Sequence, residues 1–143
     1  MKAPKIDLIV VDEATLHQVS KETTWEEVEK LNLIPRLREA TKNAWINGHG
    51  LAAIQIGIPL RFALFRWGYQ EFALMNPEII STHGKFKNLE EGCLSIPKKR
   101  FKLKRHYKIK YINDGVQKIA KGLKSQIIQH EIDHMNGIIL TDK

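Results

Sequence analysis

Hydrophobic positions in the first part of the chain form one short run, and a polar capping signal follows it. The run covers residues 6–11 and predicts a short strand. Thr23 or Thr24 can cap a helix, and Glu26 and Glu27 stand where a capping box needs its acidic residue. The pattern therefore predicts an N-terminal strand followed by a helix.

Helical spacing continues after this cap. The apolar residues recur every three or four positions, at Leu31, Ile34, Leu37, Ala40, Ala44 and Trp45. Pro35 marks a kink or a new first turn, because proline is tolerated in the first turn of a helix and not in its interior. Gly48 is predicted to end the helix as its C-cap.

Short apolar runs separated by turn signals predict strands in the middle of the chain. The runs cover residues 51–58, 62–67, 72–75 and 78–81, and the turn signals are Gly57-Ile58-Pro59, Gly68 and Asn76-Pro77. Two further strands are predicted at about residues 101–105 and 107–113. The segment Asn113-Asp114-Gly115 is typical of a tight hairpin turn.

A final helix is predicted from Gly122 to Asn136, with Gly137 as its C-cap. Its inward stripe consists of Leu123, Ile127, His130 and His134, so both histidines are expected to face the interior. The chain shows no repeat, low-complexity segment or linker. Helices near both ends with strands between them predict a single α+β domain over residues 1–143.

Composition is typical of a soluble globular protein. Hydrophobic residues make up 43% and charged residues 27%, and 143 residues suffice for one core without disulfides. No apolar run approaches the ~20 residues that cross a bilayer. Asp7 interrupts the run at residues 6–11, which therefore fails as the core of a signal peptide. A cytoplasmic location is expected.

A basic segment at residues 98–110 holds much of the formal net charge of +7. Its charged residues are Lys98, Lys99, Arg100, Lys102, Lys104, Arg105, Lys108 and Lys110, and Phe101, Leu103, Tyr107 and Ile109 interleave with them. One interpretation is a pair of strands with apolar side chains inward and lysines in solvent. The other is a surface that attracts RNA or another polyanion, with the aromatic rings as stacking platforms.

The segment Gln129-His130-Glu131-Ile132-Asp133-His134 carries the clearest candidate chemistry. On a helix, His130 and His134 lie about one turn apart, so both imidazoles can bind one metal ion. Glu131 is adjacent to the first histidine and can act as a general base. The alternative is an exposed helix with two surface histidines, which the inward stripe disfavours. A catalytic metal site needs a third ligand.

Cys93, the single cysteine, is either a buried apolar residue or a functional thiolate. It lies in a second distinctive segment, Glu91-Gly92-Cys93-Leu94-Ser95. A third is Gly48-His49-Gly50-Leu51-Ala52-Ala53-Ile54-Gln55. Together with the histidine helix, these segments resemble the three signature motifs of the peptide deformylases, G-x-G-L-A-A-x-Q, E-G-C-L-S and Q-H-E-x-D-H, in the same order and at similar separations. The resemblance extends from about Ile9 to about Leu140.

The resemblance implies both a fold and an activity. The fold has antiparallel or mixed β-sheets around a central metal-binding helix, with an N-terminal helix. The activity is hydrolytic removal of the N-formyl group from the formylmethionine that begins a nascent peptide, with release of formate. Cys93, His130 and His134 would bind the metal and leave a fourth position for water. Fe(II) is the implied ion, and Zn(II), Ni(II) or Co(II) could replace it.

Catalytic roles are implied in the same way. Metal-bound hydroxide attacks the formyl carbon, and Glu131 takes up the proton and passes it to the leaving amine. The backbone N–H of Leu94 and the side-chain amide of Gln55 stabilise the oxyanion. Outside its motif, Gln55 would be interpreted as a strand-surface residue. Glu91 is predicted to pair with Arg105 in support of the metal ligands.

The residues expected to bind the peptide are Gly48, His49, Gly50, Leu89, Gly92, Arg100, Leu123 and Ile127. The glycines at positions 50 and 92 would let the substrate backbone approach as an added strand. Arg100 is either a peptide contact or a solvated basic residue. His49 and Gln126 occupy positions that are usually apolar in the methionine pocket, so we expect methionine to remain preferred with altered discrimination.

The sequence ends nine residues after His134, whereas many bacterial deformylases continue into a C-terminal helix that helps them dock on the ribosome. The resemblance is therefore to a short form, of a kind known from phages and some other lineages. Ribosome association is expected to be weak or to depend on another surface, such as the basic segment 98–110.

Three other functions stay open. A zinc peptidase could use the same His-Glu-x-x-His helix, although Cys93 and the Gln55 segment favour a deformylase. A basic RNA- or ribosome-binding relic of the fold would bind no metal. A Cys–His nucleophile would be inactivated by alkylation and not by chelation.

Overall fold

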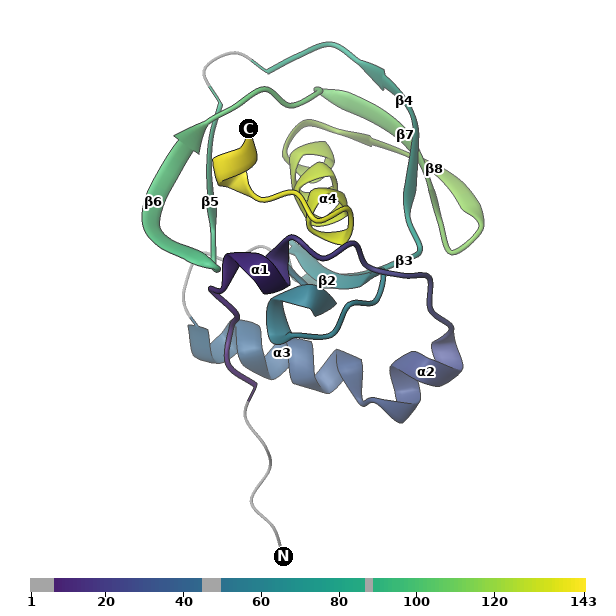
Figure 1. The fold of residues 1–143 in the computed structure, drawn as a ribbon. Coiled ribbons are helices and arrows are strands. Elements are labelled where there is room, and N and C mark those ends of the chain that lie inside the picture. Colours follow the sequence, from purple (N-terminus) through teal and green to yellow (C-terminus); the bar gives the residue numbers. More distant parts are fainter. Residues whose placement is uncertain (1–6, 45–49, 87–88) are drawn as a thin grey trace, which may run out of the picture.

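The computed structural model describes residues 7–44, 50–86 and 89–143 (Figure 1). Its α-helices are α1 (Glu13–Leu16), α2 (Trp25–Lys30), α3 (Leu33–Ala44) and α4 (Gly122–Met135), with 3-10 helices η1 (Ala53–Ile56) and η2 (Leu140–Asp142). Its strands are β1 (Gly50–Ala52), β2 (Phe62–Trp67), β3 (Gln70–Met75), β4 (Glu78–His83), β5 (Glu90–Cys93), β6 (Ile96–Lys102), β7 (Lys108–Asn113) and β8 (Val116–Lys121). Within these ranges, no helix is long and apolar enough to span a membrane.

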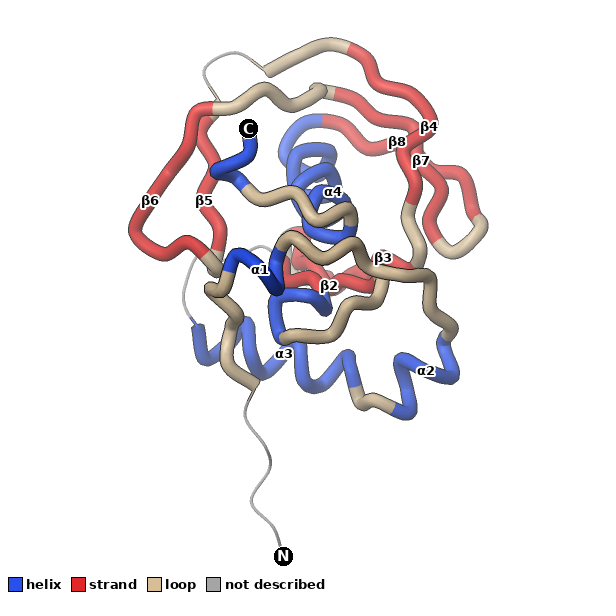
Figure 2. The backbone as a smooth tube through the Cα atoms, viewed as in Figure 1, coloured by secondary structure: helices blue, strands red, loops and turns tan. Residues whose placement is uncertain are grey.

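The strands form three small antiparallel sheets (Figure 2). The first has the order β1-β2-β3, the second has the order β4-β7-β8, and β5 pairs with β6 in the third. The α+β class predicted from the sequence is confirmed. The sheets enclose α4, which lies at the centre of the molecule in Figure 1.

The first sheet separates two hydrophobic clusters, because successive side chains of β2 point to opposite faces. The cluster on one face includes Leu33, Leu37, Ala40, Phe62 and Leu64, and so joins β2 to α3. The cluster on the other face includes Ala63, Phe65, Ile109, Ile128 and Ile132, and joins β2 to α4 and β7. Helix α4 is thus held by apolar contacts to two sheets.

The N-terminal helical region follows the predicted capping. Thr24 caps α2 by accepting a hydrogen bond from the backbone N–H of Glu27 at 3.1 Å. The Glu27 carboxylate accepts a hydrogen bond from the hydroxyl of Thr23 at 2.6 Å. Asn32, with φ of 55°, separates α2 from α3, and Pro35 stands in the first turn of α3. The predicted new first turn is confirmed.

The tight turn of the β7–β8 hairpin is also confirmed. Asp114 and Gly115 have φ of 51° and 77°, as a two-residue turn of this kind requires. Gly137 ends α4 with φ of 73°. The predictions for Trp45 and for Gly48 as a C-cap fall outside the described residues.

Three predicted strands differ from the structure. The run at residues 51–58 is a strand only at its start, in β1, because Ala53–Ile56 form η1. Residues 7–11 form no strand, and the N–H of Val10 instead donates one hydrogen bond to the carbonyl of Gln55 at 2.7 Å. The strand predicted at residues 101–105 begins earlier, at Ile96, and ends at Lys102. At residues 7–11 and 103–105 the apolar pattern was present, but no neighbouring strand among the described residues continues the ladder there.

The basic segment 98–110 contains parts of two strands, β6 and β7, as one interpretation predicted, but these strands do not pair with each other. Strand β6 pairs with β5, while β7 pairs with β4 and β8. Arg105 lies between β6 and β7 and is buried, whereas Tyr107 is half exposed. Leu123 was predicted on the inward stripe of the last helix, but it is 42% exposed, because the buried face of α4 passes through Ile128 and Ile132.

Candidate metal centre

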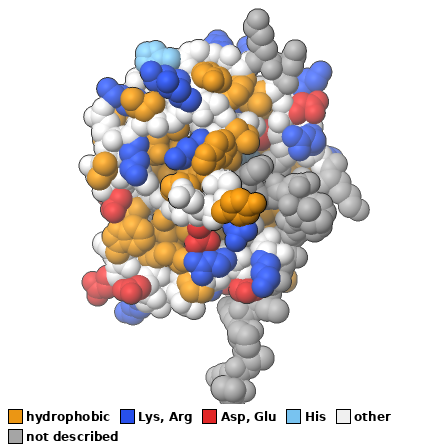
Figure 3. Space-filling model, turned by 180° about the vertical axis from the view of Figure 1, so that it is seen from behind, with side chains coloured by type: hydrophobic (Ala, Val, Ile, Leu, Met, Phe, Trp, Pro, Cys, Tyr) orange, Lys and Arg blue, Asp and Glu red, His pale blue; other side chains and the backbone are white. Residues whose placement is uncertain are grey.

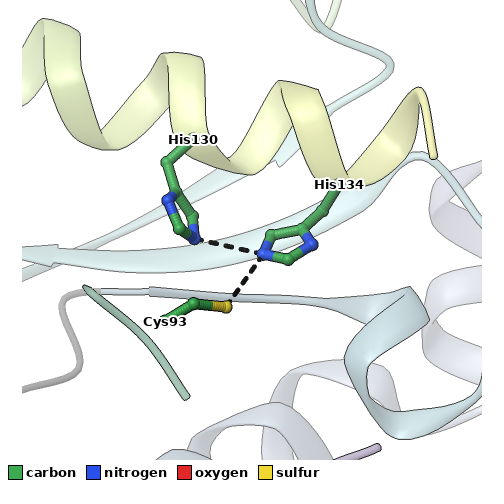
Figure 4. Close-up of side chains that lie close together, drawn as sticks. All are labelled: Cys93, His130 and His134. Carbon is green, nitrogen blue, oxygen red and sulfur yellow. Dashed lines mark hydrogen bonds between the residues drawn. The ribbon is translucent and has the colours of Figure 1, made fainter. Parts of the chain in front are cut away.

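Cys93, His130 and His134 bring one ligand atom each to a common point (Figure 4). Cys93 is the last residue of β5, and the two histidines lie about one turn apart on α4. Cys93 Sγ lies 3.3 Å from His134 Nε2, which lies 3.1 Å from His130 Nε2. All three atoms lie within 4.8 Å of one another. The fold therefore brings the three predicted ligands together.

The separations between these atoms suit a tetrahedral metal ion. With bonds of about 2.3 Å to sulfur and about 2.0–2.1 Å to nitrogen, tetrahedral ligand atoms stand about 3.3–3.6 Å apart. Two of the three separations, 3.1 Å and 3.3 Å, are slightly shorter than this, and all three lie within 4.8 Å. One thiolate and two imidazoles match the preferences of Fe(II), Co(II), Ni(II) or Zn(II).

A buried carboxylate supports His130 from the side away from the ligand atoms. Nδ1 of His130 bonds to Oε1 of Glu91, and Arg105 donates to both oxygens of Glu91 at 2.7 Å and 3.0 Å. Burial alone would raise the pKa of Glu91, but its hydrogen bonds with His130 and Arg105 lower the pKa to about 2. The predicted pairing of Glu91 with Arg105 is confirmed, and Glu91 also orients the imidazole.

Glu131 is buried beside the ligands, with 2% of its surface exposed. Its Oε2 has no hydrogen-bond partner among the described residues, and burial raises its pKa to about 7. A Cβ at Gly50 would stand 3.0 Å from Oε1 of Glu131 and 3.0 Å from the carbonyl oxygen of Leu64. The carboxylate therefore fits against β1 because residue 50 is a glycine.

Gln55 lies on η1 rather than on a strand, and its side chain is 1% exposed. Its Oε1 accepts a hydrogen bond from the N–H of Ala52 at 3.0 Å. Its Nε2 donates to Oγ of Ser95 at 3.1 Å and approaches Sγ of Cys93 at 3.6 Å. The structure thus places the amide donor of Gln55 next to a ligand atom of the candidate metal centre.

The predicted substrate residues in and next to β5 and β6 differ in exposure. Leu89 and Gly92 are partly buried. Leu94, whose backbone N–H was predicted to stabilise the oxyanion, is also partly buried and packs against the cluster that includes α3. Arg100 lies opposite Gly92 in the β5–β6 register, with 64% of its side chain exposed, and it donates to the carbonyl of Glu90 at 3.2 Å. This exposure leaves the Arg100 guanidinium accessible to a ligand.

The predicted substrate residues of α4 also differ in exposure. Ile127 is buried in the cluster between the two larger sheets, whereas Leu123 is substantially exposed. Gln126, on the same helix, is partly buried and donates to Oε2 of Glu91 at 3.2 Å. Gly48 and His49 lie outside the described residues.

Three supporting residues were not given a role by the sequence reasoning. Asp133 accepts a short hydrogen bond from Arg105, and Ser95 accepts one from Gln55. Gln129 bonds to both the N–H and the carbonyl of His106, at 3.0 Å and 2.8 Å, and so fastens the loop before β7 to α4. All three residues lie inside the motif segments quoted above, and this position was the sequence signal that could have indicated a supporting role.

Comparison with known proteins agrees with this fold and geometry. Residues 6–143 match the model of the polypeptide deformylase family. The chain is 36% identical to a peptide deformylase of Halothermothrix orenii over 98% of this chain and 94% of that protein. It is 37% identical to a peptide deformylase of Agrobacterium fabrum over 94% of this chain and 84% of that protein. The crystal structure of peptide deformylase from Thermotoga maritima superposes with a TM-score of 0.86 at 32% identity, covering 98% of each chain.

The fold and the converging thiol and imidazoles define a metal-dependent hydrolase of the α+β class. The chain belongs to the polypeptide deformylase family. This family membership confirms the resemblance seen in the three sequence motifs.

Proposed function

We propose that this chain, as one catalytic domain, removes the N-formyl group from peptides that begin with formylmethionine and releases formate. The observation that carries the proposal is the meeting of Cys93, His130 and His134 beside the unpartnered carboxylate oxygen of Glu131. A ligand set with an adjacent buried carboxylate supports hydrolysis of a carbonyl compound.

We infer that Fe(II) is the physiological ion, and that Zn(II), Ni(II) or Co(II) can occupy the same site. The thiolate of Cys93 and the imidazoles of His130 and His134 would hold it. When bound, the ion supplies Lewis acidity and lowers the pKa of a water molecule. The role of the Glu91 carboxylate is to keep the imidazole of His130 turned toward the ion.

Glu131 is the general base and general acid of the proposal. Burial raises the pKa of its carboxyl, which favours taking a proton from the attacking water and passing it on to the leaving amine. The Nε2 donor of Gln55 and the backbone N–H of Leu94 would stabilise the negative charge that develops on the formyl oxygen. Ser95 supports this role, because it holds the Gln55 amide in place.

The peptide would enter as an extended strand beside Gly50 and Gly92. Leu89, Leu123 and Ile127 would surround the methionine side chain. Arg100 would contact the peptide farther from the formyl group, because its guanidinium is exposed on β6.

Formate release under anaerobic conditions tests the proposal. We expect wild type to release formate from formyl-Met-Ala and to leave unformylated Met-Ala intact. Glu131→Gln should retain its metal and lose about 10²–10⁴-fold in turnover, because general acid–base catalysis contributes about that factor. Glu29→Gln, at an exposed position on α2, is the matched control and should behave as wild type.

Two results would contradict the proposal. Normal turnover of metal-loaded Glu131→Gln would exclude Glu131 as the base. Cleavage of the peptide bond without formate release would instead identify a peptidase.

We further propose that the protein acts in the cytoplasm on nascent peptides and that the basic segment 98–110 gives it weak ribosome association. Lys99, Lys102 and Lys104 are exposed, and Figure 3 shows basic side chains distributed over the face seen from behind, among hydrophobic ones. Cosedimentation with purified ribosomes should decrease as salt increases and should be lost when these three lysines become glutamate. Ribosome binding that survives the charge reversal would exclude this segment as the ribosome-binding surface.

A further inference from the structure

Gln126 connects α4 to the carboxylate that supports the metal ligands. It stands four residues before His130 on α4, so the two side chains project from the same face of the helix. Nε2 of Gln126 donates to Oε2 of Glu91 at 3.2 Å, and Nδ1 of His130 bonds to Oε1 of the same carboxylate. One turn of α4 therefore holds both oxygens of Glu91.

The hydrogen bonds to Glu91 are evenly divided between its oxygens. Oε1 is bonded to His130 and to Nη2 of Arg105, and Oε2 is bonded to Gln126 and to Nε of Arg105. An ionised carboxylate offers about four acceptor positions. Gln126 fills the last of these acceptor positions. The Glu91 side chain is only 7% exposed, so solvent has little access to it.

The position of the Glu91 side chain determines the position of two candidate metal ligands, His130 and Cys93. Glu91 orients His130 directly, and it lies two residues before Cys93 on β5. The hydrogen bond from Gln126 therefore holds both the His130 imidazole and the Cys93 strand against α4. Leucine at position 126 could fill the same space, but it could not donate this bond.

We propose that Gln126 is a positioning residue for the metal, acting through Glu91 on His130 and Cys93. The proposal rests on the metal site inferred under the proposed function. It is specific to this chain, because it depends on a polar residue at a position where the resemblance to the deformylases leads one to expect an apolar one.

Titration of metal-free protein with Co(II) in the absence of oxygen, against a competing chelator, tests this role. The readouts are the dissociation constant and the visible spectrum of the bound Co(II), which responds to the ligand geometry. Gln126→Leu should weaken Co(II) binding by about 10-fold and shift the spectrum, since loss of outer-shell partners costs about 10–100-fold in metal affinity. Gln126→Glu should weaken binding further, because its carboxylate would repel Glu91.

Lys124→Leu is the matched control on the same helix. Its ammonium lies over the ring of Phe72, 4.5 Å from the ring centroid, so this change should leave both readouts unaltered. Gln126→Leu with wild-type affinity and a wild-type spectrum would overturn the proposal, as would an equal loss in Lys124→Leu. A wild type that binds no Co(II) would instead refute the proposed metal site itself, so the two failures are distinguishable.

Discussion

Helix α4 has two buried sides of opposite character. On one side, Ile128, Ile132 and Met135 pack into an apolar cluster between two sheets. On the other, His130 contacts the buried ionic network of Glu91 and Arg105. The apolar side gains free energy from burial itself. The ionic side incurs a desolvation cost and is stable only when every partner is present. Helix α4 is thus anchored by its apolar side, while its ionic side positions the candidate metal ligands.

Removal of Arg105 should have the largest effect on stability. Arg105→Ala would remove the buried counter-charge of Glu91 and leave Asp133 paired with Lys143, and breaking a buried ionic network typically costs about 3–5 kcal/mol. Urea unfolding of the metal-free protein measures this loss, and Co(II) titration should show weakened metal binding as well. Arg38→Ala breaks an exposed bidentate pair with Glu71 and is the control, with an expected cost of about 0–1 kcal/mol. Equal losses in the two variants would remove the distinction between the buried and exposed pairs.

Truncation on the apolar side should cost a similar or smaller amount of stability, and its effect should be confined to stability. Ile128 is 0% exposed, and a cavity at such a position costs about 2–5 kcal/mol. Ile128→Ala should lower the free energy of unfolding in urea, while metal affinity and formate release per folded molecule stay near wild type. Ile119→Ala on β8, which is 55% exposed, should change stability by no more than about 0.5 kcal/mol. A selective loss of metal affinity in Ile128→Ala would show that the two sides of α4 are not independent.

Local signals explain what the sequence could predict. The Asn113-Asp114-Gly115 turn, the Thr24 cap and the positive φ of Gly137 after α4 each depend on a few neighbouring residues, and each is present. The metal ligands could be proposed because His130 and His134 share a helix face, and because the motif resemblance supplied Cys93 from a distant strand. The same resemblance supported the pairing of Glu91 with Arg105.

Features that depend on distant partners could not be predicted from the pattern alone. Residues 7–11 have a strand-like sequence, but they meet η1 and not a strand edge. The contact of Gln126 with Glu91 requires α4 to lie beside β5, which no spacing along the chain reveals. The exposure of Leu123 follows from the rotation of α4 about its axis, and the sheets on either side of the helix set that rotation.

Strand β5 supplies both Cys93 and Glu91, yet among the described residues its sheet consists of β5 and β6 alone. A two-stranded hairpin is marginally stable by itself, so its position depends on the contacts it makes with the rest of the protein. An ion bound between Cys93 and the α4 histidines would therefore act as a cross-link between the hairpin and the helix. Part of the binding free energy would then order the hairpin, so metal occupancy and local folding would be thermodynamically linked. Affinity for the ion would measure the order of this hairpin as much as the quality of the three ligands.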